Sequence, residues 1–258
     1  MLAPGNGRMT WTCAASLALL AALMKSLSLL GPGRRVRNRL FFISSPLVSV
    51  DSLRRVGIAT PGDVGRTLLR CGVTMGAFLF AHRLHGWLAA TLNLSGWSLS
   101  YLAAPFVWLT GEAAGSVVRL LYLPTGRLVP LVHDHALAAR SIAGFWGQGW
   151  NVWFSDWFRQ MIFRPWHRMP VQAVVVVFLI SGLMHEFVLN FTLWLITNHA
   201  PFGSMMIYFG LQALGILAER KWFSKGTPMN RCFVWLVVLG PAPLIVNEAL
   251  LRTLRLWP

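Results

Sequence analysis

The sequence has little charge for its length. Only 12% of its 258 residues are charged, whereas an ordinary soluble domain carries about 25%, and 55% of them are hydrophobic. Among the charged residues the acidic ones are fewer: the chain has 8 Asp and Glu and 23 Lys and Arg, which gives a formal net charge of +15. Long apolar runs fill much of the chain. This composition excludes a soluble globular domain and predicts an all-α, polytopic transmembrane protein.

Cysteine and the common catalytic motifs are also scarce. Cys13, Cys71 and Cys232 lie far apart in or beside apolar runs, so neither a disulfide framework nor a CxxC metal site is indicated. GxSxG, HExxH, GxxxxGK[ST] and GxGxxG are all absent, which removes the usual support for a hydrolase, a zinc protease or a nucleotide-driven pump. His133 and His135 form only a weak metal signal. We expect no metal and no cofactor.

The basic residues lie mostly between the apolar runs. This placement favours lipid headgroups and membrane topology over nucleic acid as the reason for the positive charge. The runs predict about six to seven spans, the six clearest of which are 11–30, 68–94, 97–123, 171–197, 202–217 and 233–251. Connections 94–96 and 198–202 contain no Lys or Arg, whereas the alternate connections hold nearly all of them. The positive-inside rule then places the basic connections in the cytoplasm.

Segment 124–170 differs from the spans because it is polar and basic but rich in tryptophan. Its tryptophans are Trp146, Trp150, Trp153, Trp157 and Trp166, and its basic residues include Arg159, Arg164 and Arg168. Indoles favour headgroup depth and arginines favour phosphates. We therefore expect an interfacial, amphipathic segment.

The fourth predicted span contains two ionisable residues, His185 and Glu186. They lie roughly 21 Å along a helix from the start of the apolar run, a depth at which ionisable groups usually mark a function or a buried partner. On a regular helix Ser181, His185 and Thr192 share a face, and Glu186 points about 100° away. A neutral imidazole can take a proton from an alcohol, and the amide of Asn151 could donate to a developing oxyanion. The spacing supports a structural histidine and a catalytic one equally.

Glu112 is a second ionisable residue inside a predicted span. From charge alone, its expected partner is Arg83 or Arg119. Small residues around it, including Gly111 and Gly115, favour close helix contact.

Two short patterns together resemble a known family. Phe145, Trp146 and Gly147, followed by Trp150 and Asn151, are similar to the FWG-x-x-WN signature of the membrane-bound O-acyltransferases, and most of all to their wax-synthase branch. The later run 181–186, with its Ser-Gly pair and its His-Glu pair, is similar to the second signature of that branch. The two patterns occur in the expected order and at about the expected distance, so their combination is more specific than either alone.

The resemblance implies transfer of a fatty acyl group from acyl-CoA to the hydroxyl of a lipophilic alcohol, with wax esters as the favoured product. His185 would be the catalytic base, and Asn151 would be its paired asparagine. The residues expected to contact substrate are Trp146, Trp150, Arg159, Ser181 and Glu186. Acyl-CoA is a co-substrate, membrane lipids surround the protein, and the transfer is direct, without a covalent enzyme intermediate.

Two features depart from the family pattern. Gln148 and Gly149 stand where the family commonly has basic residues, so the CoA phosphates would be held differently. The expected spans are also fewer than the eight or more usual in the family. We therefore expect residues 1–258 to form one membrane-embedded domain with its motif-bearing core at 131–190, as a short member or one lacking N-terminal helices.

Three other functions remain open at this stage. One is an O-acyltransferase of the same family with a different acceptor, such as a sterol, diacylglycerol or glycolipid, because apolar pockets discriminate weakly. The others are non-enzymatic, a membrane transporter or channel and a silent scaffold. The excess of arginine, 20 against 3 lysines, favours a bacterial inner membrane, with the endoplasmic reticulum as the alternative.

Overall fold

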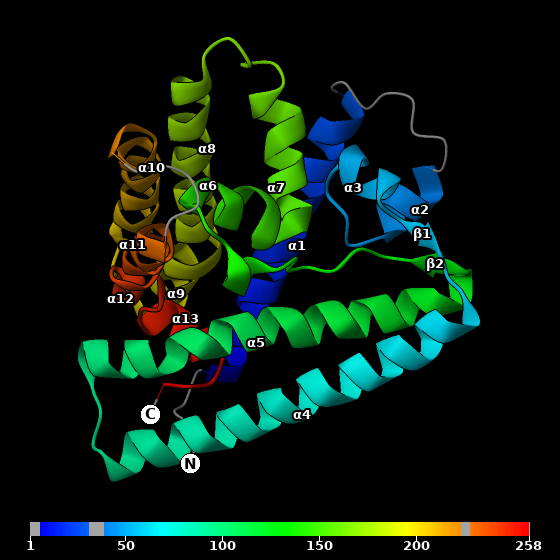
Figure 1. Ribbon diagram of the computed structural model, residues 1–258. Coiled ribbons are helices and arrows are strands. Elements are labelled where there is room, and N and C mark those ends of the chain that lie inside the picture. The colour runs from blue at the N-terminus through cyan, green and yellow to red at the C-terminus, as the bar shows by residue number, and fades with distance from the viewer. Residues whose placement is uncertain (1–5, 31–38, 223–227, 258) are drawn as a thin grey trace.

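A computed structural model describes residues 6–30, 39–222 and 228–257 (Figure 1). The described residues are almost entirely helical, and their single β-pairing joins β1 (Gly57–Ile58) antiparallel to β2 (Arg127–Leu128). Within those ranges, four helical stretches are long and apolar enough to cross a membrane: Gly7–Leu30, Pro61–Thr91, Gly96–Thr125 and Pro170–Thr197. The prediction of an all-α, polytopic membrane protein is confirmed. The basic residues at 31–38 and Lys225 lie outside the described residues.

The first, second and third stretches correspond to α1 (Asn6–Leu30), α4 (Pro61–Thr91) and α5 (Gly96–Tyr122). Helices α4 and α5 pack along each other as a long antiparallel pair, which crosses the lower end of α1 in Figure 1. Between α1 and α4 lie two short helices, α2 (Arg39–Ser44) and α3 (Val50–Arg54). The β1–β2 pairing joins the start of α4 to the segment that follows α5.

The fourth stretch is one continuous helical rod made of three parts. It comprises α8 (Pro170–His185), a π-helical turn η5 (Glu186–Asn190) and α9 (Phe191–Thr197). A π turn hydrogen-bonds i to i+5 and so inserts an extra residue into the helix. Side chains after Asn190 are therefore rotated by roughly 100° from the positions that a regular helix would give them.

The fifth and sixth predicted spans are not among the four long apolar stretches. Segment 202–217 falls in α10 (Ser204–Trp222), which lies outside the four stretches above and packs against α8. The prediction of one continuous helix over 233–251 is wrong: the chain there forms α11 (Pro228–Leu239), α12 (Ala242–Ile245) and α13 (Glu248–Thr253). Pro241 and Pro243 cannot donate backbone hydrogen bonds, and Asn247 caps α13 with its side chain, so the helix restarts twice.

The predicted interfacial segment contains most of the irregular structure. It runs through the 3-10 turns η1 (Leu123–Thr125) and η2 (Ala136–Ala138) to α6 (Ile142–Gly144), the π turn η3 (Phe145–Gly149), α7 (Val152–Phe158) and a second π turn, η4 (Arg159–Phe163). Buried side chains of this segment join two hydrophobic clusters. One cluster also includes residues of α8 and α10, and the other includes residues of α1 and α8. The segment is therefore folded into the helix bundle as well as lying at its surface.

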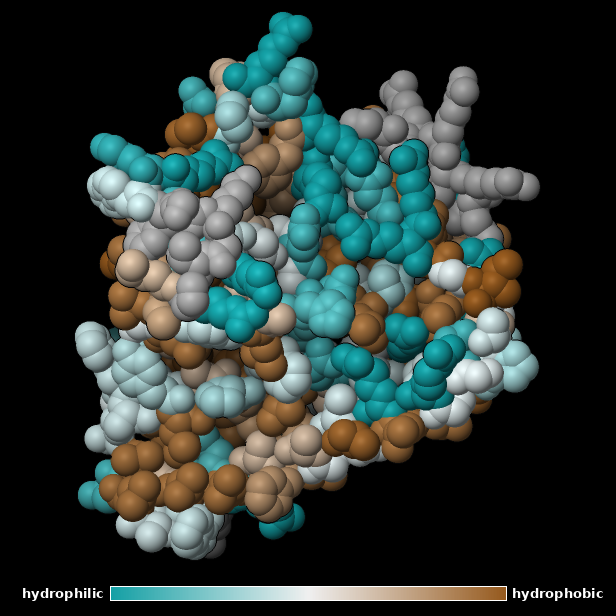
Figure 2. All heavy atoms as spheres, in the orientation of Figure 1, coloured by the Kyte–Doolittle hydropathy of each residue, from teal (hydrophilic) through white to brown (hydrophobic). Residues whose placement is uncertain are grey.

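The surface divides by polarity. Figure 2 shows hydrophilic residues gathered over the region of α3 and α7 and hydrophobic residues along α4 at the lower edge. The exposed apolar side chains of α4 include Leu68, Leu69, Val73, Phe80 and Trp87. An apolar helix face of this extent is what contact with lipid requires.

Candidate functional site

The motif at 145–151 forms a compact turn held by its own backbone. The Ser141 hydroxyl caps α6 by accepting from Gly144 N at 2.9 Å, and the π turn η3 follows directly. Trp150 N then donates to Phe145 O at 2.7 Å, which closes the turn. Asn151 adopts a left-handed conformation, with φ of 40°, and its carbonyl accepts from the first turn of α7. Few residue types tolerate that backbone conformation, and asparagine is one of them.

The aromatic side chains of this turn lie against α8 and α10. The Trp146 ring contacts Phe178 of α8 and Phe209 of α10, with centroids 6.1 and 5.8 Å away. Its indole N–H donates to Gln212 Oε1 at 3.1 Å, so the polar edge of the ring is satisfied as well. Trp150 packs on Phe145 at 5.6 Å. The motif thereby anchors the interfacial segment to the two helices that surround the predicted base.

His185 lies at the end of α8 beside the same aromatic cluster. Its ring is 4.6 Å from that of Phe209, which also contacts Trp146. His185 Nδ1 lies 2.7 Å from the carbonyl oxygen of Ser181. Because a carbonyl can only accept, Nδ1 carries the hydrogen and Nε2 is left as the basic nitrogen. Phe209 thus links the His185 ring to Trp146, whose ring lies 6.3 Å from that of Trp150, and Asn151 follows Trp150 in the sequence.

The predicted shared face of Ser181, His185 and Thr192 does not form. Thr192 is fully buried and its hydroxyl lies 3.2 Å from Ser16 Oγ of α1, whereas the His185 ring faces α10. The π turn η5 between the two residues causes this rotation. The prediction was wrong because it assumed a regular helix. Ser181 contributes its carbonyl to the site, and contact of its side chain with a substrate stays a prediction.

Glu186 is turned toward the start of α10. Its carboxylate accepts from the backbone N–H of Met205 at 3.0 Å and of Met206 at 3.4 Å, and from Asn190 Nδ2 at 2.8 Å. A carboxylate at a helix N-terminus satisfies donors that have no partner within the helix and is stabilised by the helix dipole. Glu186 therefore joins the end of α8 to α10, and its predicted contact with substrate stays a prediction.

Asn190 is a buried polar residue that the sequence analysis passed over. It donates to Glu186, to Pro201 O at 3.1 Å and to Ser204 Oγ at 3.3 Å, and it accepts from Asn247 Nδ2 at 3.1 Å. The side chain is completely buried. An asparagine in the middle of an otherwise apolar run was the available signal, because a buried amide needs hydrogen-bond partners from other segments.

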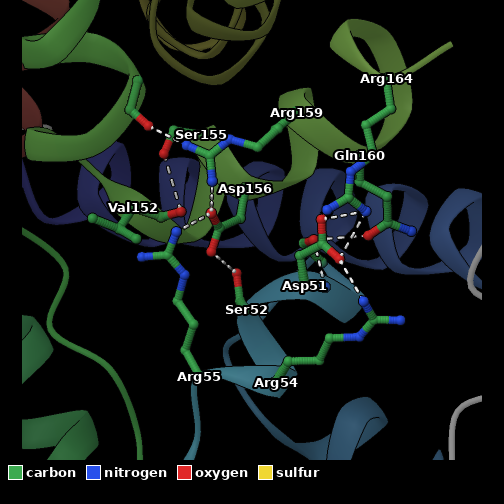
Figure 3. A network of polar contacts seen from close by, with 12 residues as sticks. Asp51, Ser52, Arg54, Arg55, Val152, Ser155, Asp156, Arg159, Gln160 and Arg164 are labelled. Atoms are coloured by element: carbon green, nitrogen blue, oxygen red, sulfur yellow. Dashed lines mark hydrogen bonds and ion pairs between the residues drawn. The ribbon is translucent and has the colours of Figure 1, made fainter.

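Arg159 belongs to a polar network between α3 and α7 (Figure 3). Its guanidinium donates to the carbonyl of Gly147 at 2.6 Å and to Asp156 at 2.7 Å. The fully buried Asp156 also accepts from Ser52 and Arg55, each at 3.0 Å. Arg159 thus fixes the π turn of the motif to the N-terminal part of the chain. Its predicted place near a CoA entrance stays a prediction.

Glu112 does not have the partner that its charge alone predicted. Glu112 pairs with Arg70 and with His133, at 3.1 Å from its Nδ1, and not with Arg83 or Arg119. His133 is buried, whereas His135 is exposed, so the two do not face a common ligand. Among residues 6–30, 39–222 and 228–257, no group of three or more His, Cys, Asp and Glu could hold a metal ion.

Comparison with known proteins identifies this region. Residues 129–209 match the model of the membrane bound O-acyl transferase family, an interval that contains Trp146, Asn151 and His185 and ends at Phe209. Within this interval the chain is similar to that family. Its resemblance extends to the wax synthase-like members, because 164 residues are 26% identical to the probable long-chain-alcohol O-fatty-acyltransferase 7 of Arabidopsis thaliana. That alignment covers 57% of this chain and 47% of the relative, so the chain spans about half the length of the curated relative that it matches.

Proposed function

We propose that the protein is a membrane-embedded O-acyltransferase that moves a fatty acyl group from acyl-CoA to the hydroxyl of a lipophilic alcohol, forming a wax ester. The observation that supports this most directly is the state of His185. Its Nδ1 is bound to Ser181 O inside an apolar helix, which leaves Nε2 as a neutral base beside the family motif. The name of the Arabidopsis relative supports an alcohol as the acceptor.

The reaction needs only this base and the two substrates. His185 Nε2 takes the proton of the alcohol as its oxygen attacks the thioester carbonyl, and the C–O bond forms. The tetrahedral intermediate collapses, the C–S bond breaks, and the CoA thiolate receives the proton from the imidazolium. Asn151 is expected to donate its amide to the negative oxygen of the intermediate. All atoms and charges balance without a covalent enzyme intermediate.

An apolar groove beside the site suits the hydrocarbon part of a substrate. It has a volume of about 230 Å³ and lies between α8 and α10, lined by Val175, Phe178, Leu179, Gly210, Ala213, Leu214 and Leu217. Phe178 also contacts Trp146, so the groove adjoins the aromatic cluster around His185. We assign a substrate chain to this groove, because every lining side chain is apolar.

The orientation follows from the basic connections. Arg164, before α8, pairs with Asp51, after α1, at 2.9 Å, so two of the basic connections lie at the same end of the bundle. The positive-inside rule makes that end cytoplasmic, where acyl-CoA is available and CoA can leave. The arginine bias favours a bacterial inner membrane as the host.

Ester formation in membranes that contain the protein tests the proposal. Labelled acyl-CoA is supplied with long-chain alcohols, a sterol or diacylglycerol, and wild type is compared with His185→Ala at matched abundance. We expect a loss of about 100-fold or more, as for removal of a general base. His199→Ala, an exposed histidine beyond α9, is the matched control and should keep wild-type activity.

Two results contradict the proposal in different ways. If the wild type is folded and inserted but forms no ester with any acceptor, the acyltransferase function is wrong and a scaffold or transporter is favoured. If ester forms equally well in His185→Ala, the activity stands but His185 is not its base. The acceptor that supports the highest rate distinguishes a wax synthase from a member with another acceptor.

A further inference from the structure

The backbone on both sides of Trp150 and Asn151 is held by a neighbouring segment. Val152 N donates to Val132 O, and Asp134 N donates to Gly149 O, each at 2.8 Å. Residues 132–134 therefore bracket the Trp150–Asn151 pair with one hydrogen bond before it and one after it. We call residues 132–134 the bracket. Its central residue, His133, places its ring 4.4 Å from that of Trp150.

His133 in turn is held by α5. Its ring is only 5% exposed, and Nδ1 lies 3.1 Å from Glu112 Oε1. The second oxygen of Glu112 accepts from the guanidinium of Arg70 on α4. The slot for the ring exists because position 111 is glycine: a Cβ there would lie 2.4 Å from His133 Cε1. The α4–α5 pair is thereby joined to the motif through one buried polar chain.

Burying Glu112 and its partners within a membrane helix costs free energy, which indicates that these residues serve a function. Glu112 is 5% exposed and lies inside a stretch that could span the bilayer. Buried ionisable groups at such depth are unfavourable unless paired, and removing one partner leaves the other uncompensated. Asn151, which the bracket holds, has a left-handed backbone, and the hydrogen bonds on either side of the Trp150–Asn151 pair fix the chain in that conformation.

We propose that Glu112 and His133 are positioning residues for the acyl transfer, and that they act through the bracket to hold Trp150 and Asn151 in place within the motif turn. The inference rests on the proposed function. Neither residue needs to touch a substrate: His133 acts through the ring of Trp150 and through the two backbone bonds, and Glu112 acts through His133.

Three variants disturb this chain at different points. Gly111→Ala displaces the His133 ring without removing a polar group, His133→Asn removes the ring, and Glu112→Gln removes the charge at nearly constant size. Gly76→Ala on α4 is the matched control, because a Cβ there meets nothing within 4 Å. We expect kcat to fall about 10- to 100-fold in all three variants, as for misplacement of a reacting group by about 1 Å, and KM for acyl-CoA to stay within about threefold. The double variant Glu112→Gln/His133→Asn should lose no more than the worse single variant.

A second readout does not depend on activity. Val152 is only 2% exposed and donates its backbone N–H to the bracket, so a cysteine at Val152→Cys reports opening of this contact to a water-soluble maleimide. Cys71 and Cys232 are replaced by serine in this background, and the buried Cys13 is kept. Labelling should be several-fold faster when Gly111→Ala is added, because local opening exposes the thiol more often, and unchanged when Gly76→Ala is added.

The outcomes separate this inference from the proposed function. An active wild type, reduced kcat in the three variants and faster labelling with Gly111→Ala together support the inference. Active wild type with unchanged kcat in Gly111→Ala and His133→Asn overturns it while leaving the acyltransferase function intact. If the wild type forms no ester, the proposed function fails. Unchanged labelling with Gly111→Ala then also overturns the inference that Glu112 and His133 hold Trp150 and Asn151 in place, whereas faster labelling supports that hold. If Gly111→Ala does not reach the membrane, Glu112→Gln decides in the same way.

Discussion

Replacing Glu186 by glutamine separates the two roles that this residue could have. The carboxylate accepts three hydrogen bonds, two from the start of α10 and one from Asn190. In Glu186→Gln one oxygen becomes an NH₂ group that faces a donor, so at least one bond is lost together with the charge. A partly buried donor without a partner costs about 1–3 kcal/mol, and the charge at a helix N-terminus contributes about 0.3–1 kcal/mol. We therefore expect a destabilisation of about 2–3 kcal/mol.

That loss should appear in the melting temperature of the purified protein in detergent. For a chain of this length each kcal/mol shifts Tm by about 2–4 °C, so Glu186→Gln should melt about 4–12 °C lower. Below that temperature, ester formation should stay within about tenfold of wild type, far above His185→Ala. Glu248→Gln is the control, since Glu248 also lies in a first helical turn but pairs with Arg252 and should shift Tm little. Unchanged melting with activity as low as His185→Ala would refute this reasoning and return Glu186 to substrate contact.

Three further predictions concern the groove and the contacts around the motif. Gly210→Leu should narrow the groove, because Gly210 lines it and a Cβ at this position would meet nothing within 4 Å. The preference for acyl-CoA or alcohol should therefore shift toward shorter chains. A series of chain lengths measures this shift, with Gly86→Leu on α4 as the control. Gly182→Ala should lower the free energy of unfolding by about 1–3 kcal/mol in a detergent melt, because a Cβ there would lie 3.2 Å from Met206 Cα, a backbone atom of α10, as well as 2.7 Å from Met206 Sδ. Gly210→Ala should have no effect. Arg159→Lys should lower the free energy of unfolding by about 1–2 kcal/mol, because one ammonium cannot reproduce the guanidinium hydrogen bonds to Gly147 and Asp156. The control Arg54→Lys, at an exposed arginine, should change Tm by less than about 1 °C.

The sequence was sufficient for the helical class and for the two motifs because both depend on local patterns. The apolar runs that became α1, α4, α5 and α8 have the length of a span, and hydropathy alone reveals them. The spacing of Trp146, Asn151 and His185 was also visible without coordinates, and all three residues lie within the range 129–209 that matches the family. These features need no knowledge of which segments touch.

What could not be predicted depends on packing between distant segments. The partners of Glu112 are Arg70 and His133, and charge alone offered no reason to prefer them to Arg83 or Arg119. The orientation of Thr192 changed because η5 adds a residue to the helix, which periodicity analysis takes as regular. Pro241 and Pro243 marked the break within 233–251, but the prediction followed the high hydropathy of that run and treated it as one helix.

The three π turns have a consequence for how this region can change in length. Turns η3, η4 and η5 all lie between Phe145 and Asn190, where each adds one residue to a helical path. Deleting a single residue from any of them would produce a more regular helix, yet it would rotate everything downstream by roughly 100° and turn a motif side chain away from its neighbours. Single-residue deletions should therefore be tolerated by folding better than by activity. Spacing in this region is thus as much a part of the site as the identity of its side chains.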